Sequence, residues 1–419
     1  MRPHVPSLRP LLCAPFLLGG FLGGCGSAAV VVPSAGASPD DAGTAADVQG
    51  TPELDASVSV DASSGTDAAA PPTGTIPVTR AACTPFGSAP RPLNTAENAL
   101  FQPPCRGGGV SLSDFVDAEG TTRLACLYTP AAATQSHPLP LVVFIHPSVV
   151  GPDITSALSG IRGDLDTADL TGDPASPGFL LLEPAGRVVD DRYYPFPDNA
   201  DSPGWDNWDR QMWPGGTRTV NGTAYPENVD ATSFDHYIAE VVASNLVDPS
   251  RIYLMGWSNG SSMGVLYALN RPNIAAAAVY SAPDPFHAFN DPCPQTAITG
   301  TPSDDTSIQV FNPGVPIYHV HNDCDIAGLC PNSEYLSQSL LSANVDPISD
   351  QIITATQQST GTCLATCGTN PYADYGSLTD PFGYLGNLPG FVAGTVNHMR
   401  WPSDWTSTMY AFLRNHPKP

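Results

Sequence analysis

The chain has 419 residues, of which 42% are apolar and only 13% are charged, and its formal net charge is -24. Lys418 is the only lysine, so the surface lacks the clustered cations with which proteins hold the phosphates of nucleic acid or anionic lipid. We therefore expect no nucleic-acid partner. The length is sufficient for one α/β domain with an extensive core, together with further segments outside that domain.

The first 25 residues have the pattern of an export signal. Arg2 and Arg9 precede or flank the start of an apolar stretch at residues 11–22, which is too short and too rich in glycine to span a membrane. The stretch is followed by Gly23-Gly24-Cys25, and with Leu22 this resembles the lipobox of bacterial lipoproteins. The resemblance implies a lipid anchor on Cys25, with ordinary signal cleavage nearby as the alternative. Either outcome predicts an extracytoplasmic protein, at the bacterial cell envelope or secreted, that meets a membrane only through such an anchor.

Residues 26–78 contain no aromatic residue and are rich in Ala, Ser, Pro, Gly, Thr and Asp. Such a segment buries too little apolar surface to offset its conformational entropy, so it is expected to be a disordered acidic tether. The folded domain is then expected to cover residues 79–419.

Within this domain, continuous apolar runs alternate with amphipathic segments, which is typical of a mostly parallel sheet flanked by helices. Helical spacing of Phe234, Ile238 and Val241 predicts a helix. In chain order, the expected elements are strands at 141–145 and 179–182, a helix at 231–245, strands at 251–255, 275–280 and 315–320, and a last helix at 404–415.

The pentapeptide Gly256-Trp257-Ser258-Asn259-Gly260 lies between the strand at 251–255 and a helix-like run at 261–270. This strand–turn–helix context is what a nucleophile elbow requires, because small flanking residues permit the sharp turn that lifts a serine hydroxyl off the sheet. A GxSxG motif alone often arises by chance, but its context here favours Ser258 as a nucleophile on an α/β-hydrolase fold.

A serine hydroxyl needs a general base and an orienting carboxylate, which in this fold follow in the order Ser, acid, His. His398 lies late in the chain on an expected loop, so we expect it to be the base rather than a side chain that only packs against Trp401. We expect Asp325, which closely follows a predicted strand, to be the acid. Asp323 is the near alternative, and Asp284 is a more distant one.

Several segments between residues 139 and 402 resemble the polyhydroxybutyrate depolymerase/feruloyl esterase-like family of secreted α/β-hydrolase serine esterases. The matching segments are Val143-Phe144-Ile145-His146, Val229-Asp230-Ala231-Thr232-Ser233-Phe234, residues 247–253, the Gly256–Gly260 elbow, residues 319–325 and His398-Met399-Arg400-Trp401-Pro402. The resemblance implies Ser258, Asp325 and His398 as a catalytic triad acting on an ester, without a cofactor.

Two departures from the family concern the loops around this triad. The family usually has His-Gly where this chain has His146-Pro147, and proline has no N–H to donate. We therefore expect the oxyanion hole to use the N–H groups of Ser148 and Asn259. Asn322 stands where the family commonly has glycine, so the acid loop is expected to differ in shape.

Tryptophans near the elbow are candidates for substrate binding. Trp205-Asp206-Asn207-Trp208 resembles the family's Trp-Asn-Trp loop, and we expect Trp205, Trp208 and Trp257 to contact the substrate. An equally weighted alternative is that Trp205, Trp208 and Trp213 simply pack a loop.

Eight cysteines remain once Cys13 and Cys25 are set aside, and in an oxidising compartment an even number predicts disulfides. The pairing is open, with local Cys324–Cys330 and Cys363–Cys367 bridges as guesses. Zinc is disfavoured because the chain has no pair of CxxC knuckles and no HExxH helix, so no metal is expected. The eight are Cys83, Cys105, Cys126, Cys293, Cys324, Cys330, Cys363 and Cys367.

These patterns favour hydrolysis of a carboxylic ester through an acyl-enzyme. A polyester such as a polyhydroxyalkanoate, or an acyl or feruloyl ester on a polysaccharide, fits an exported enzyme. The alternatives are a serine peptidase of the same fold and a surface lipoprotein that binds a polymer without catalysis. The sequence leaves the oligomeric state open.

Overall fold

The computed structural model of the protein describes residues 74–77, 105–118, 120–148, 150–189, 202–205, 218–220, 223–225, 228–282, 284–286, 307–322, 336–337, 339–341, 348–353 and 397–419. All of them belong to one compact unit, residues 67–419. The expected signal segment lies outside the described residues, and so does the expected tether apart from its end. Among the residues described, no helix has the length and apolar character needed to cross a membrane.

Within the segment expected to be a tether, residues 74–77 are described. Gly74–Pro77 form β1, which pairs antiparallel with β13, Ser307–Val310. Pairing with an existing strand satisfies the backbone groups of a segment that has little apolar surface of its own. This strand precedes residue 79, where the folded domain was expected to begin, and the boundary stays a prediction.

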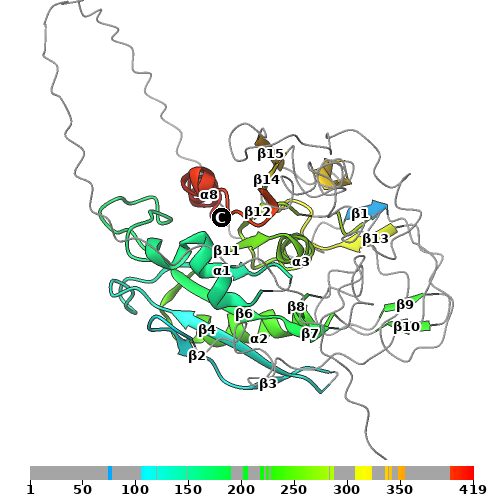
Figure 1. Ribbon diagram of the computed structural model, residues 1–419, viewed down its shortest axis with the longest axis horizontal. Helices are drawn as coiled ribbons and strands as arrows, with labels where there is room; N and C mark the ends of the chain where they lie inside the picture. The colour runs from blue at the N-terminus through cyan, green and yellow to red at the C-terminus, as the bar shows by residue number, and fades with distance from the viewer. Residues whose placement is uncertain are drawn as a thin grey trace, which may run out of the picture. The chain divides into compact units, whose positions relative to one another are not determined.

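A nine-stranded sheet forms the centre of the described structure (Figure 1). Its strand order is β15-β14-β12-β11-β5-β6-β4-β2, with β3 paired to β4. The run from β6 to β15 is parallel, whereas β4 lies antiparallel to β6, β2 and β3. The bounds are β2 Val110–Ser111, β3 Phe115–Val116, β4 Thr122–Tyr128, β5 Leu139–Ile145, β6 Leu180–Ala185, β11 Val247–Trp257, β12 Ala276–Tyr280, β14 Ile317–Asn322 and β15 Ile348–Ile353.

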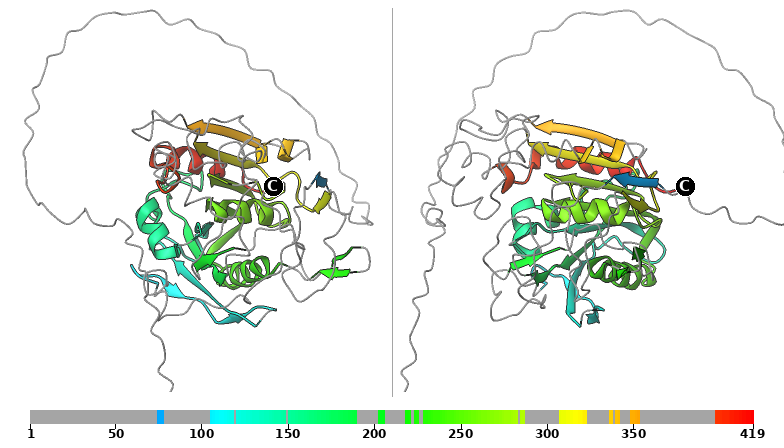
Figure 2. Two further views of the ribbon diagram at one scale, coloured as in Figure 1. Left: turned by 45° about the vertical axis from the view of Figure 1, so that its right-hand side comes forward. Right: turned by 90° about the vertical axis from the view of Figure 1, so that its right-hand side faces the viewer.

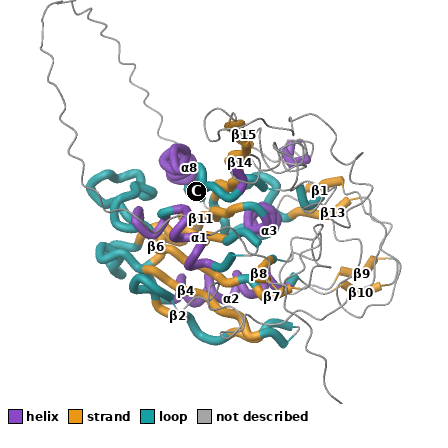
Figure 3. The backbone as a smooth tube through the Cα atoms, viewed as in Figure 1, coloured by secondary structure: helices purple, strands orange, loops and turns teal. Residues whose placement is uncertain are grey.

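Helices follow the parallel strands (Figure 3). They are α1 Pro152–Ser159 with the short 3₁₀ helix η1 Ile161–Asp164, α2 Val229–Ala243, α3 Asn259–Ala268 and α8 Ser403–Arg414. The five strands and two helices expected from the sequence are confirmed, with ends that shift by a few residues. This mostly parallel sheet, flanked by helices and carrying an antiparallel strand near its start, has the α/β-hydrolase fold.

Alternate residues of the buried strands serve two separate apolar layers. On β5, Leu141, Val143 and Ile145 pack with residues of α2 and α3, whereas Val142 and Phe144 pack with residues of η1 and α8. Helices therefore cover both faces of the sheet (Figure 2). This explains why the strands read as continuous apolar runs rather than as an alternation.

In the described part of the chain, three pairs of short strands lie outside the main sheet. Besides β1 with β13, β7 (Arg187–Val189) pairs antiparallel with β8 (Ser202–Gly204), and β9 (Arg218–Val220) pairs antiparallel with β10 (Thr223–Tyr225). The β7–β8 pair directly follows β6 and leads into Trp205. It thereby brings this tryptophan back toward the end of β5.

Helix α2 begins at a cap that the sequence supplies. The Asn228 side chain accepts hydrogen bonds from the N–H groups of Asp230 and Ala231, both at 3.0 Å. Asp230 in the first turn also forms an ion pair with the buried Arg123 of β4. The cap and the ion pair together fix the start of α2 against the sheet.

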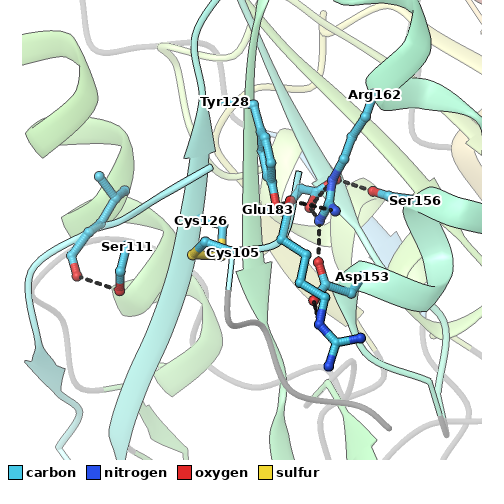
Figure 4. The surroundings of a disulfide bond; sticks show 10 residues. Cys105, Ser111, Cys126, Tyr128, Asp153, Ser156, Arg162 and Glu183 are labelled. Carbon is cyan, nitrogen blue, oxygen red and sulfur yellow. Dashed lines mark hydrogen bonds and ion pairs between the residues drawn. A yellow bond between two sulfur atoms is a disulfide. The ribbon is translucent and has the colours of Figure 1, made fainter. Parts of the chain in front are cut away.

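One disulfide lies in the described part of the chain and joins Cys105 to Cys126 of β4 (Figure 4). Beside it, Arg162 of η1 stacks over the Tyr128 ring, with its guanidinium carbon 4.1 Å from the ring centroid. Arg162 Nε also donates to Glu183 at 3.2 Å, and the Ser156 hydroxyl donates to the same carboxylate. These contacts tie α1 and η1 to β6.

Candidate active site

Ser258 occupies a strained turn between β11 and α3. Its φ of 55° and ψ of -123° lie outside the regions that non-glycine residues normally adopt. Its N–H donates to the carbonyl oxygen of Tyr280 on the neighbouring strand at 2.9 Å. This is the geometry expected of a nucleophile elbow.

Close backbone contacts explain the two glycines of the elbow. A Cβ on Gly256 would lie 2.7 Å from the carbonyl oxygen of Gly260. A Cβ on Gly260 would lie 2.3 Å from the carbonyl oxygen of Ile145 and 2.4 Å from that of His146. Helix α3 therefore starts directly against the end of β5, and only glycine permits that approach.

The His398 side chain lies beside Ser258, although 140 residues separate the two in the sequence. Its Nε2 lies 2.9 Å from Ser258 Oγ. The indole N–H of Trp257 donates to the His398 carbonyl oxygen at 2.8 Å, and the Tyr280 hydroxyl donates to the Asn397 carbonyl oxygen at the same distance. Trp257 in the elbow and Tyr280 on the adjacent strand thus hold the backbone that carries the His398 imidazole.

Trp401 completes the support of the histidine loop. Its ring lies edge-on to Trp257, Phe144 and Tyr280, with centroid separations of 5.4–5.8 Å. Its indole N–H donates to the Thr406 hydroxyl in α8 at 2.8 Å. His398 therefore lies within reach of Ser258 on a loop that Trp401 supports, and its role as the base stays a prediction.

The expected acid, Asp325, lies outside the described residues, as does its near alternative Asp323. Strand β14 ends at Asn322, one residue before Asp323 and three residues before Asp325. Asp284, the distant alternative, is fully buried after β12, where its Oδ1 accepts from the Phe286 N–H at 2.8 Å. The choice of Asp325 stays a prediction.

His146 at the end of β5 is buried and has a defined tautomer. Its Nε2 accepts a hydrogen bond from the Gly186 N–H at 2.8 Å, so the ring proton lies on Nδ1. Nδ1 in turn donates to the Pro147 carbonyl oxygen at 2.6 Å. Burial lowers the pKa of His146 to about 4, so the ring is neutral at pH 7.

The two expected oxyanion donors come from different segments. Ser148 follows the Pro147 position, and Asn259 is the first residue of α3. The N–H of the first helical residue has no carbonyl oxygen of a preceding helical turn to accept its hydrogen bond. The helix dipole also places partial positive charge at this end of the helix. Both features suit the stabilisation of a developing anion beside Ser258.

Trp205 and Trp257, both expected to bind substrate, are buried in the structure. The Trp205 ring packs between His146 and Phe234, and the Trp257 indole supports the histidine loop. Both rings hold neighbouring segments in place and present no surface to solvent. The expected contact residue Trp208, together with Trp213, lies outside the described residues.

Of the cysteines considered from sequence, the structure describes Cys105 and Cys126, and their pairing was not foreseen. The others, including Cys25 and the guessed bridges Cys324–Cys330 and Cys363–Cys367, lie outside the described residues. Across the part of the chain that is described, no three His, Cys, Asp or Glu side chains gather as metal ligands would.

No protein-family model and no curated protein matches this chain. Among solved structures, a thermostable esterase is 16% identical with a TM-score of 0.41, over 74% of this chain and 63% of that one, so the chain spans less than two thirds of its length. A ferulic acid esterase is 12% identical with a TM-score of 0.37, over 59% of this chain and 89% of that one. An acetyl xylan esterase from Aspergillus awamori is 19% identical with a TM-score of 0.34, over 57% of this chain and 80% of that one. These scores are low, and the fold is recognised from the strand order and the elbow of the chain itself.

Proposed function

We propose that this chain is a serine carboxylic-ester hydrolase that acts through an acyl-enzyme. The observation that carries the proposal is the 2.9 Å contact between His398 Nε2 and Ser258 Oγ, with the serine raised on a strained elbow. A hydroxyl becomes a useful nucleophile when a base within hydrogen-bond reach can take its proton.

In the proposed reaction, Ser258 Oγ attacks the ester carbonyl carbon while His398 Nε2 accepts the hydroxyl proton. His398 then returns that proton to the leaving alcohol, and a water attacks the acyl-enzyme by the same route in reverse. The N–H groups of Ser148 and Asn259 stabilise the oxyanion, and loss of one such donor typically raises the barrier by about 2.7–4 kcal/mol. Asp325 orients the imidazole and stabilises its protonated form.

We further propose that the enzyme works outside the cytoplasm. The apolar segment at 11–22 and the lipobox-like Cys25 support export, and a disulfide between Cys105 and Cys126 suits an oxidising compartment. Export in turn favours a substrate too large to enter a cell. A polyester of the polyhydroxyalkanoate kind, or an acyl or feruloyl ester on a polysaccharide, meets that condition.

A substrate panel tests the activity. The full-length protein is incubated with p-nitrophenyl acetate and butyrate, methyl ferulate, acetylated xylan, polyhydroxybutyrate and a peptide amide. We expect turnover of short esters and little amide cleavage, and loss of turnover in Ser258→Ala. The matched control is Ser407→Ala, which removes an exposed hydroxyl from α8 and should keep full activity.

Two results would contradict the proposal. If wild type and Ser258→Ala hydrolyse the esters equally slowly, Ser258 is excluded as the nucleophile. If the peptide amide is the substrate cleaved fastest, the peptidase alternative is favoured. Export is tested separately by cell fractionation in a bacterial host. We expect wild type in the membrane fraction and Cys25→Ser released from it, whereas cytoplasmic wild type would exclude export.

A further inference from the structure

We propose that Trp205 is a positioning residue that sets the distance between the two sides of the oxyanion hole. The inference deepens the proposed function and rests on it. The two donors, Ser148 N–H after β5 and Asn259 N–H at the start of α3, lie on separate segments. Trp205 belongs to neither segment and contacts both.

Trp205 is joined to the β5 side through its ring. The indole N–H donates to the carbonyl oxygen of His146 at 2.7 Å. The same carbonyl is the atom that a Cβ on Gly260 would meet at 2.4 Å, so it lies against the start of α3. The tryptophan therefore holds the backbone two residues before Ser148.

Trp205 is joined to the α3 side through its main chain. Its N–H donates to the Asn259 side-chain oxygen at 2.8 Å, and the Asn259 side-chain amide donates to the Trp205 carbonyl oxygen at 3.3 Å. Asn259 is the residue directly after the nucleophile. A pair of hydrogen bonds in opposite directions fixes both the position and the orientation of the asparagine.

A second path through the β7–β8 pair closes the connection. Gly186 donates its N–H to His146 Nε2, and a Cβ on Gly186 would lie 2.4 Å from the carbonyl oxygen of Gly204. Gly204 directly precedes Trp205. The contacts thus form a closed circuit that runs through His146, Gly186, Gly204 and Trp205. Displacement of any one of these residues would disturb its contacts on both sides.

The surroundings of the ring argue for positioning rather than substrate contact. The Trp205 side chain is fully buried, 4.6 Å from the His146 ring and 5.2 Å from the Phe234 ring of α2 between centroids. Substrate therefore does not meet this indole in the structure. Its effect on the reaction passes through the two donors that it holds, which must lie about 2.7–3.1 Å from the developing oxyanion.

Two replacements at position 205 remove the indole N–H. Trp205→Phe replaces the bicyclic indole by a smaller, single ring. In contrast, 3-benzothienylalanine at this position replaces the N–H by sulfur and keeps the volume of the bicyclic ring. The matched control is Tyr267→Phe, because Tyr267 also lies 5.2 Å from the Phe234 ring and donates to Asp235 Oδ1 at 2.7 Å, away from both donors.

The first measurement needs no ester substrate. A fluorophosphonate reacts when Ser258 Oγ forms a bond to phosphorus, fluoride leaves and the serine proton passes to His398, while the P=O oxygen occupies the oxyanion hole. We expect both position-205 variants to be labelled about 10- to 100-fold more slowly than wild type, since a 1 Å misplacement can cost about 100-fold. Tyr267→Phe should be labelled at a rate within about twofold of the wild-type rate, because it leaves both oxyanion donors in place.

Ester kinetics and unfolding give the second measurement. If short esters are turned over, kcat should fall with the labelling rate while KM stays nearly constant, because the hole acts in the transition state. Normal labelling and normal kcat in the folded 3-benzothienylalanine protein would overturn the proposal, even if its unfolding temperature falls. Wild type that is labelled but hydrolyses no ester refutes the proposed function while the labelling series still decides the role of Trp205. Wild type that resists labelling would overturn both.

Discussion

The approach of α3 to β5 predicts opposite effects for two glycine-to-alanine substitutions one helical turn apart. In Gly260→Ala, the new methyl would lie 2.3 Å and 2.4 Å from two backbone oxygens, those of Ile145 and His146. In Gly264→Ala, the nearest atom would be the flexible Ile145 side chain at 3.4 Å, an ordinary contact. Both residues belong to α3, so the helix preference of alanine is common to both.

The magnitudes follow from these distances. Alanine in a helix is favoured over glycine by about 0.5–1 kcal/mol, so Gly264→Ala should stabilise the protein by about that amount. Overpacking a core costs about 1–3 kcal/mol, and backbone atoms relax less than side chains, so Gly260→Ala should lose at least the upper part of that range. Because the helix preference is common to both, the two variants should differ by the cost of the clash, about 2–3 kcal/mol or more in free energy of unfolding.

Urea unfolding and ester kinetics measure the two consequences. Relief of the clash in Gly260→Ala requires α3 to move away from β5, which carries Ser258 and Asn259 with it, so kcat should fall about 100-fold per ångström moved. Gly264→Ala should keep the kcat of wild type. If Gly260→Ala unfolds at the same urea concentration as Gly264→Ala and is equally active, the close approach of the helix to the strand is wrong.

Three further predictions concern buried groups. Asp230→Ala should lower the free energy of unfolding by about 3 kcal/mol or more, because the buried Arg123 loses one of its two carboxylate partners and keeps only Asp117, and an unchanged urea midpoint would contradict this. Reduction of the Cys105–Cys126 disulfide, or Cys105→Ser with Cys126→Ser, should cost about 2–4 kcal/mol in urea unfolding, and unchanged stability would contradict it. The folded pKa of His146, about 4, lies below its ordinary 6.5, so the unfolded chain binds more protons between these pH values. Stability should therefore be full above pH 6.5 and fall by about 3 kcal/mol toward pH 4, and His146→Gln should flatten this part of the curve.

The features predicted correctly from sequence are those that depend on local pattern. Continuous apolar runs identified the central strands because both faces of this sheet are covered. The elbow was predictable because a sharp turn after a strand demands small residues at Gly256 and Gly260. Ser258 and His398 were singled out by chain order, and the structure brings their side chains within hydrogen-bond distance.

Elements that depend on distant partners were missed. Strand β4 was not expected, because Arg123 within it has the character of a surface residue. Its charge is buried only because Asp117 and Asp230, from the β3 end and from α2, both reach it. The role of Trp205 depends on contacts with residues 54 and 59 positions away, and periodicity cannot register such contacts. Burial of a charge or of a tryptophan becomes predictable only when its partners are known.

Pro147 stands where the family that this chain resembles usually has glycine, and the neighbouring hydrogen bonds bear on how the chain accommodates it. Because Gly186 donates to His146 Nε2, the proton on Nδ1 must point at the Pro147 carbonyl oxygen. In a planar trans peptide the N–H is directed opposite to the carbonyl, so fixing the Pro147 oxygen also fixes the Ser148 N–H on the other side. The histidine therefore orients the Ser148 N–H, the proposed oxyanion donor, which lies one residue beyond the proline that has no N–H to donate. This works only while the ring is neutral, since a proton on Nε2 would break the bond from Gly186, and burial keeps that proton off at physiological pH.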